Sequence, residues 1–167
     1  MTMPTDLHWV NGPWTGRLAL SARPRGGDWL EDEIVNWKRS GVDAILSLLT
    51  PDEERELDLA YEADTAKKHD VDFSSFPIPD RQVPRSESSL RQMIEKINSR
   101  LLAGSNVLVH CRQGVGRTGL VAACLLIKHG MSPGAAVETL SAIRGVPVPE
   151  TTEQRDWIER FAPALTK

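Results

Sequence analysis

The sequence contains only two cysteines, Cys111 and Cys124, and no long apolar run. Two cysteines do not make the disulfide framework of a small secreted domain, and they fit a reducing compartment in which a thiol stays available for chemistry. The longest apolar stretch, 120–127, is far too short to span a bilayer, and residues 1–13 lack both a basic leader and a signal-peptide core. These absences predict a cytoplasmic protein without membrane insertion.

The chain also lacks a strong net charge, internal repeats, and a linker rich in proline or glycine. Its formal net charge is −3, which argues against a general nucleic-acid or membrane-surface binder. No His, Cys or Asp cluster has metal-ligand spacing, so we expect no metal and no other cofactor. A length of 167 residues suffices for one buried core, and we expect residues 1–167 to form a single domain, with a monomer favoured.

Hydrophobic patterns alternate between the strand period and the helix period along the chain. Strands are predicted at 18–22, with one buried face, and at 44–49, 71–76 and 106–110. Helices are predicted to start at Asp28, at Thr50, at Ser86, near Arg117, at Ser132 and at Thr151. The alternation implies right-handed crossovers and an α/β fold, with a mostly parallel central sheet flanked by helices.

Two of the predicted helices begin with the spacing of a capping box, one at Asp28 and Glu31 and the other at Thr50 and Glu53. The second of these helices is predicted to run toward Lys68. Its acidic residues are interpreted as a solvated face rather than as a site. The same interpretation covers the other charged residues as far as Lys68, and the four weighed as the general acid and set aside are Asp52, Glu53, Glu54 and Glu56.

The segment after the strand at 106–110 combines a cysteine, two glycines and an arginine. Five residues separate Cys111 from Arg117, and the glycines let the backbone curl until several N–H groups point at one centre. Such a nest binds phosphate, and the N-terminus of the following helix adds positive charge that also stabilises a thiolate. Ligands of parallel sheets collect at the carboxyl ends of strands, where this segment lies. The predicted phosphate-binding residues are Arg112, Gln113, Gly114, Val115, Gly116 and Arg117.

Individual side chains of this segment have predicted roles in cleaving a phosphate ester. Cys111 is the candidate nucleophile, and Arg117 is a planar fork for two phosphoryl oxygens that lysine would not replace well. Thr118 is expected to hydrogen-bond the sulfur, which makes it a better leaving group from a phosphocysteine intermediate. His110 is expected to order the loop by hydrogen bonding, and Cys124 is interpreted as core packing.

Residues 110–118 closely resemble the active-site signature of the protein tyrosine phosphatase superfamily, in which His-Cys is followed by five residues, an Arg, and Ser or Thr. Gly114 is similar to the dual-specificity branch, and Gly116 looks like the kinase-associated phosphatase subgroup, where many dual-specificity enzymes have Ser. The resemblance implies a single phosphatase domain with a mixed central sheet and no metal.

Asp80 is the predicted general acid. It lies in a loop that leaves a strand, and Pro77 and Pro79 stiffen the chain before it. The family places its acid on such a mobile loop roughly thirty residues before the cysteine, and here the separation is 111 − 80 = 31. The competing interpretation is a turn aspartate after proline.

Gln154 has two equally good interpretations. It resembles a glutamine near the same place in the family that helps to position water and the acid loop. It also stands three residues after Thr151, which is the spacing of a capping-box partner.

The substrate is inferred from features of the family that this chain lacks. The tyrosine-specific branch uses a recognition tyrosine and a Trp-Pro pair before the acid, whereas here the single tyrosine, Tyr61, lies in a charged segment and Ile78 replaces the tryptophan. Inositol-lipid phosphatases usually carry lysines in the loop, where this chain has neutral Gln113 and Val115. We therefore expect a dual-specificity-like pocket and a phosphorylated protein or peptide, especially one with phosphotyrosine.

Other functions stay open at this point. A phosphoinositide or RNA-end phosphatase would share the chemistry and differ only in the walls of its pocket. A non-catalytic phosphate-binding module would not need Cys111, Asp80 and Thr118 together. A sulfurtransferase or an arsenate reductase with a similar loop would not call for Asp80.

Overall fold

The central feature of the fold is a five-stranded sheet with strand order β1-β2-β5-β3-β4, seen in a computed structural model that describes residues 5–166. β1 runs antiparallel to β2, and the other neighbouring pairs are parallel. The predicted mostly parallel, mixed sheet is therefore confirmed, while β1 was not predicted. The strands are β1 (His8–Val10), β2 (Leu18–Ser21), β3 (Ala44–Ser47), β4 (Asp72–Ser75) and β5 (Val107–His110).

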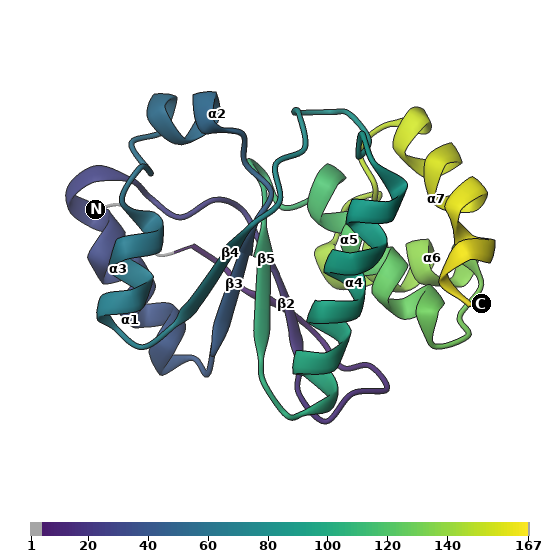
Figure 1. The fold of residues 1–167 in the computed structure, drawn as a ribbon, viewed down its shortest axis with the longest axis horizontal. Coiled ribbons are helices and arrows are strands. Elements are labelled where there is room, and N and C mark those ends of the chain that lie inside the picture. The colour runs from purple at the N-terminus through teal and green to yellow at the C-terminus, as the bar shows by residue number, and fades with distance from the viewer. Residues whose placement is uncertain (1–4, 167) are drawn as a thin grey trace.

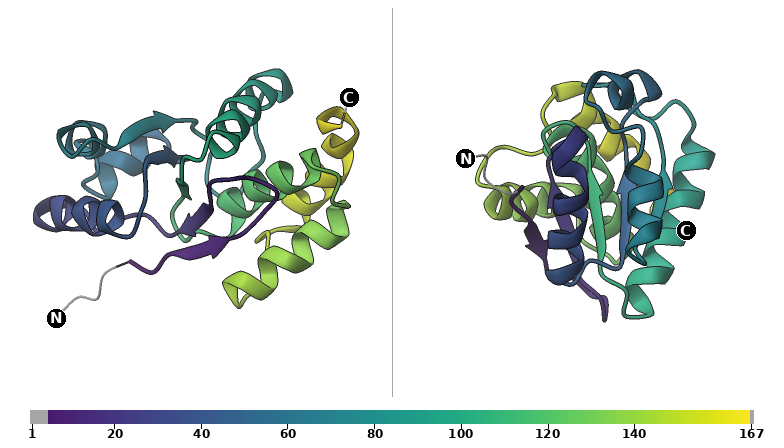
Figure 2. Two further views of the ribbon diagram at one scale, coloured as in Figure 1. Left: turned by 90° about the horizontal axis from the view of Figure 1, so that it is seen from below. Right: turned by 90° about the vertical axis from the view of Figure 1, so that its left-hand side faces the viewer.

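Helices cover both faces of this sheet (Figure 1). α1 (Leu30–Arg39) and α3 (Glu62–Lys68) lie on one side, and a short 3-10 helix, η1 (Gly27–Trp29), precedes α1. The other side carries α4 (Glu87–Leu102), α5 (Gly116–Lys128), α6 (Pro133–Arg144) and α7 (Thr152–Leu165). Figure 2 shows the same separation from below, with the blue helices on one side and the green and yellow helices on the other.

The middle strands are buried on both faces, because each face has its own hydrophobic cluster. This corrects the prediction for 18–22, whose alternation indicated a single buried face. All four residues of β2 are buried: Leu18 and Leu20 join the cluster under α4–α7, whereas Ala19 joins the cluster under α1 and α3.

The predicted helix from Thr50 to Lys68 is two helices, α2 (Pro51–Glu56) and α3. The chain turns between them at Asp58, whose φ is 58°. The turn contacts the segment before α1: Gly27 N donates to Asp58 O at 3.1 Å. Tertiary contact therefore interrupts a sequence whose local propensity favours one continuous helix.

The predicted capping boxes differ in outcome. The box of Thr50 and Glu53 is present, with both reciprocal hydrogen bonds. The box at Asp28 is wrong, because residues 27–29 form η1 and the N-cap of α1 is Trp29, without a side-chain cap. Ser86, Ser132 and Thr151 each cap the helix that was predicted to start there.

Three parallel strands end at the same edge of the sheet and deliver three loops to it. β3 leads into α2, β4 leads into the loop 76–86, and β5 leads directly into Cys111. In Figure 1 this edge is at the top, with α2 above it. Within residues 5–166, no helix combines the length and apolar character needed to cross a bilayer.

We expect Leu108→Ala to lower the free energy of unfolding by about 2–5 kcal/mol, since removing a buried leucine leaves a cavity. Leu108 lies in the central strand β5 and has no exposed surface. Leu102, which is 48% exposed at the end of α4, is the matched control, and its alanine variant should change stability by less than about 0.5 kcal/mol. Urea unfolding midpoints measure both, and equal losses would contradict this account of the core.

Candidate active site

Cys111 follows β5 directly and begins the loop that leads into α5 at Gly116. The residue is buried, and Gly114 N donates a hydrogen bond to Cys111 Sγ at 3.3 Å. The sulfur therefore faces a backbone N–H at the N-terminal end of a buried helix, where the helix dipole also favours negative charge. This is the position that the sequence predicted.

Both glycines of the loop lie at close approaches to other parts of the chain. Gly114 has φ +74°, and a Cβ there would lie 2.5 Å from the carbonyl of Ser21. A Cβ on Gly116 would lie 2.9 Å from Gln154 Oε1 and 3.0 Å from Glu150 Oε2. The first glycine lets the loop pack on β2, and the second lets α5 start beneath α7.

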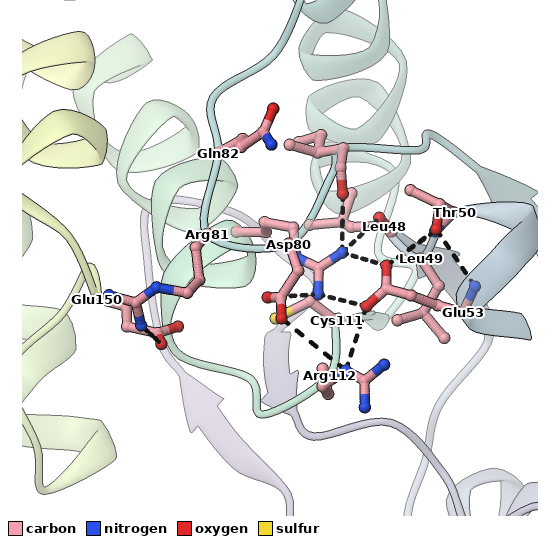
Figure 3. Close-up of polar contacts among 12 residues, drawn as sticks. Leu48, Leu49, Thr50, Glu53, Asp80, Arg81, Gln82, Cys111, Arg112 and Glu150 are labelled. Atoms are coloured by element: carbon pink, nitrogen blue, oxygen red, sulfur yellow. Dashed lines mark hydrogen bonds and ion pairs between the residues drawn. The ribbon is translucent and has the colours of Figure 1, made fainter. Parts of the chain in front are cut away.

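Arg117 lies in the first turn of α5 and is 1% exposed. Its Nη1 donates to Glu53 Oε1 at 2.6 Å and to Ile78 O at 2.7 Å. Its Nη2 donates to Glu53 Oε2 at 2.9 Å and to Asp80 Oδ1 at 2.9 Å. Figure 3 shows Glu53 of α2 and Asp80 of the loop after β4 approaching the same point beside Cys111.

Electrostatics keep the pair of Arg117 and Glu53 charged. Burial raises the pKa of Glu53, but hydrogen bonds from Arg117 and from the Thr50 backbone, with the charge on Arg117, outweigh it and bring the pKa to about 2. Burial lowers the pKa of Arg117, and the hydrogen bonds and charge of Glu53, with the negative charges of Cys111 and Asp80, raise it above its ordinary value. The geometry is a two-point carboxylate–guanidinium pair.

Glu53 is a site residue that the sequence interpretation missed, because it was assigned to a solvated helix face. Its side chain is 8% exposed. It serves as the capping-box residue of α2 and as the partner of Arg117 at once. The signal in the sequence that could have placed Glu53 at the site is its position in the first helical turn after the buried strand β3.

Asp80 lies where the prediction put it, in the loop after β4 and beside Arg117. Its side chain is 46% exposed, and its Oδ2 lies 3.9 Å from Arg112 Nε. Arg112 itself contacts Glu53 Oε2 at 3.4 Å and Glu56 Oε2 at 3.2 Å. Elsewhere in the loop, Gln113 is exposed and Val115 is partly buried, and both are uncharged. Arg112 is therefore the charged side chain of the loop 111–115.

Gln154 is buried and makes the capping box of α7 with Thr151. Its Nε2 also donates to Gln82 O at 3.1 Å, and the neighbouring Arg81 forms an ion pair with Glu150. The capping interpretation is therefore present in the structure, and the same side chain holds the loop that carries Asp80. A role in positioning water stays a prediction.

His110 and Thr118 are buried next to the loop, but neither makes the hydrogen bond that was predicted. His110 Nε2 lies 2.6 Å from Glu62 Oε2 of α3, so its partner is a helix on the far side of the sheet rather than the loop. Among the described residues, Thr118 Oγ1 has no hydrogen-bond partner. Glu62 is a second buried carboxylate that the charged-helix interpretation missed, and its contact depends on the break before α3.

Cys124 is buried in α5, as its core-packing interpretation predicted, and burial raises its pKa to about 12. Across residues 5–166, no group of three or more His, Cys, Asp and Glu side chains is arranged to hold a metal ion. The side chains gathered at the sheet edge are the thiol of Cys111, the guanidinium groups of Arg112 and Arg117, and the carboxylates of Glu53 and Asp80.

An α/β fold with a cysteine after a strand and an arginine in the first turn of the next helix has the arrangement of a cysteine-dependent phosphatase. Residues 21–131 match the family model described as "Tc-R-P: Polymorphic toxin system, DSP-PTPase phosphatase". The match covers more than half of the chain, and the protein therefore belongs to this family of dual-specificity protein tyrosine phosphatases, which are hydrolases.

Relatives agree with this assignment. The chain is 28% identical over 138 residues to "Cyclin-dependent kinase inhibitor 3" of Rattus norvegicus, covering 81% of this chain and 65% of that protein. It is 30% identical over 137 residues to "Phosphatidylinositol 3,4,5-trisphosphate 3-phosphatase and protein-tyrosine-phosphatase PTEN1" of Arabidopsis thaliana, covering 75% and 31%. The chain thus spans about 65% of the length of the rat relative.

Solved structures confirm the predicted phosphatase fold. Kinase associated phosphatase, with its catalytic-site cysteine substituted by serine, superposes with a TM-score of 0.89 at 24% identity, covering 99% of this chain and 98% of that one. The active form of Tk-PTP gives a TM-score of 0.79 at 28% identity, covering 94% and 96%. The predicted likeness to kinase-associated phosphatases therefore extends to the whole fold.

We expect the free energy of unfolding to fall as the pH is lowered through the acid range, because the Arg117–Glu53 pair is lost there. The pKa of Glu53 is about 2 in the folded state, below its ordinary 4.5, so ionised Glu53 stabilises the fold above pH 4.5 and this contribution is lost as pH falls from 4.5 toward 2. Glu53→Gln lacks the contribution at every pH. The gap in free energy of unfolding between wild type and variant should therefore narrow across that window, as urea unfolding at stepped pH would measure.

Asp52→Asn is the matched control for this prediction, because Asp52 is the neighbouring acid of α2 and its side chain is 89% exposed. A surface pair contributes little to stability. The gap between wild type and Asp52→Asn should stay near zero throughout, and a Glu53→Gln gap that is equally flat would show that the buried pair does not act as described.

Proposed function

We propose that this chain is a cysteine-dependent phosphomonoester hydrolase in which Cys111 attacks phosphorus and carries a phosphocysteine intermediate. One observation supports this most: Asp80 Oδ1 lies 2.9 Å from Arg117 Nη2, so a carboxyl from the β4 loop meets the guanidinium of the Cys111 loop. A reactive thiol needs only the loop, whereas hydrolysis in two steps also needs an acid and base at the same place.

Substrate binding exchanges partners at Arg117. Glu53 and Ile78 accept hydrogen bonds from both N–H groups of Nη1 and from one N–H of Nη2. The donors that remain for a substrate are therefore Nε and the second N–H of Nη2, which Asp80 occupies in this structure. A phosphoryl group that accepts from Nε and Nη2 takes the place of the Asp80 carboxylate. Glu53 keeps the guanidinium in plane while this exchange occurs, so the fork is pre-oriented for two oxygens.

The same exchange prepares Asp80 as an acid. Asp80 loses its contact with a cation and gains a phosphoryl dianion as neighbour, which favours the protonated carboxyl. The carboxyl then donates its proton to the leaving oxygen as the Cys111 sulfur forms the S–P bond and the P–O bond breaks. In the second step the Asp80 carboxylate takes a proton from water, which attacks phosphorus and releases the thiolate.

Three further residues have supporting roles in this proposal. Thr118 Oγ1, which has no partner within residues 5–166, donates to the sulfur as it leaves the intermediate. His110 holds the start of the loop through Glu62 rather than through the loop itself. Gln154 positions the acid loop through Gln82 O, and in the second step it helps to position water.

We propose a phosphorylated protein or peptide as the substrate. We also propose that residues 1–167 form one phosphatase domain and that the enzyme is metal-independent, monomeric and cytoplasmic; residues 1–4 and 167 lie outside the described range. Within the loop 111–115 the charged side chain is Arg112, which Glu53 and Glu56 already engage, and the loop has no lysine to add charge for a polyphosphorylated headgroup. A phosphoinositide is the second candidate, supported by the lipid phosphatase activity named for the Arabidopsis relative.

Cys111→Ser should lower kcat on an aryl phosphate by more than about 1,000-fold, because a serine hydroxyl at this site is a far weaker nucleophile than a thiolate. Affinity for the substrate should persist, since Arg117 and the loop amides are intact. Cys124→Ala is the control and should keep turnover, because burial raises the pKa of Cys124 to about 12 and its thiol stays protonated. A kcat of purified Cys111→Ser within about 10-fold of the wild-type value would sink the nucleophile assignment.

Asp80→Asn should lower kcat by about 100- to 10,000-fold and remove the basic limb of the pH–rate profile, since the amide has no proton to donate. The loss should grow with the basicity of the leaving group and be small for a dinitrophenyl phosphate. Asp52→Asn serves again as the exposed control. A uniform loss across leaving groups would point to a different acid.

A further inference from the structure

The peptide units of the phosphate loop are held from outside the loop. Arg112 O accepts from Arg23 N at 3.2 Å. Gln113 O accepts from Arg144 Nη2 at 2.8 Å, and Gly114 O accepts from Arg144 Nε at 3.1 Å. Three consecutive carbonyls thus point away from the site, and one arginine side chain holds two of them.

Outward carbonyls dictate inward amides, because the C=O of one residue and the N–H of the next point in opposite directions across a trans peptide. The Gln113 carbonyl therefore aims the N–H of Gly114 inward, and this amide does donate to Cys111 Sγ at 3.3 Å. By the same geometry, the Gly114 carbonyl aims the N–H of Val115 inward. Arg144 thereby sets the direction of two of the donors that would face a phosphoryl group.

The loop needs such a restraint because its centre is a glycine. Gly114 has φ +74°, and a glycine can rotate its two flanking peptides at little steric cost. On one side the backbone of Ser21 confines it, and on the other side Arg144 binds its carbonyl. Without the guanidinium, either peptide could turn its carbonyl toward the anion, which would replace a donor with an acceptor.

The position of Arg144 is itself well defined. It is the last residue of α6, and Gly145 ends that helix in the left-handed conformation, with its N–H bonded to Ser141 O at 2.8 Å. Among the described residues, no carboxylate forms an ion pair with Arg144. Its planar fork of donors is directed at the two loop carbonyls, a geometry that the ammonium of lysine cannot match.

We propose that Arg144 is a positioning residue that holds the amides of Gly114 and Val115 toward the phosphoryl oxygens without touching the substrate. The proposal rests on the proposed phosphatase function. It assigns the loop conformation to a contact from α6, a helix that supplies none of the reacting groups.

The test measures tungstate affinity by calorimetry in the Cys111→Ser background, so that binding is separated from chemistry. Adding Arg144→Ala should weaken tungstate binding by about 10- to 100-fold, because misdirected amides no longer donate to the oxyanion. The tungstate affinity with Arg144→Lys should lie between that of the Cys111→Ser parent and that with Arg144→Ala, since one ammonium replaces two directed hydrogen bonds. Arg91→Ala, which removes an exposed arginine on α4, should bind tungstate as the parent does.

Chemical rescue separates positioning from a structural role. With Cys111 intact, guanidinium at low millimolar concentration should restore part of the kcat lost by Arg144→Ala on an aryl phosphate, and it should not affect Arg91→Ala. If Arg144→Ala does not fold, Arg144→Lys replaces it in the test, and its tungstate binding should be weaker than that of the Cys111→Ser parent.

The experiment distinguishes a failure of this inference from a failure of the proposed function. If Cys111→Ser binds tungstate and the added Arg144 substitutions leave the affinity unchanged, Arg144 does not position the loop and the inference is overturned. If Cys111→Ser binds no tungstate and the wild-type protein hydrolyses no phosphate ester, the proposed function fails, and the inference falls with it.

Discussion

The buried ion pair between Arg117 and Glu53 is the interaction on which the site depends. A guanidinium that is 1% exposed needs a partner, and losing one member of such a pair costs about 3–5 kcal/mol. Glu53 can fill this place because the capping box with Thr50 anchors it at the start of α2. The pair therefore joins the loop after β5 to the loop after β3, and it fixes the direction in which the arginine presents its remaining donors.

Two carboxylates share this arginine and are set apart by their surroundings. Glu53 is 8% exposed, accepts from both Nη atoms and has a pKa of about 2, so it is ionised at neutral pH. Asp80 is 46% exposed and makes one bond, so it can leave and return. Different burial of two acids around one cation is a common way to divide structural and proton-transfer roles.

The backbone of the loop depends on parts of the fold that supply no reacting group. Ser21 of β2 leaves room only for glycine at position 114, Gln154 of α7 leaves little room for a side chain at Gly116, and Arg144 of α6 holds two carbonyls outward. Helices that cover one face of the sheet therefore also shape the phosphate nest at its edge.

The sequence by itself determined the alternation of strands and helices, the capping of α2, the place of Cys111 after a buried strand, and the arrival of Asp80 from a neighbouring loop. The first three follow from periodicity or spacing within a short window, whereas Asp80 was singled out by the resemblance to the phosphatase family together with the prolines before it. Only the tertiary structure decided that Glu53 and Glu62 are buried partners of Arg117 and His110, since those contacts join residues 64 and 48 positions apart. A charged helix looks solvated in sequence because its periodicity shows no apolar neighbour, and an ion-pair partner from another loop leaves no local pattern.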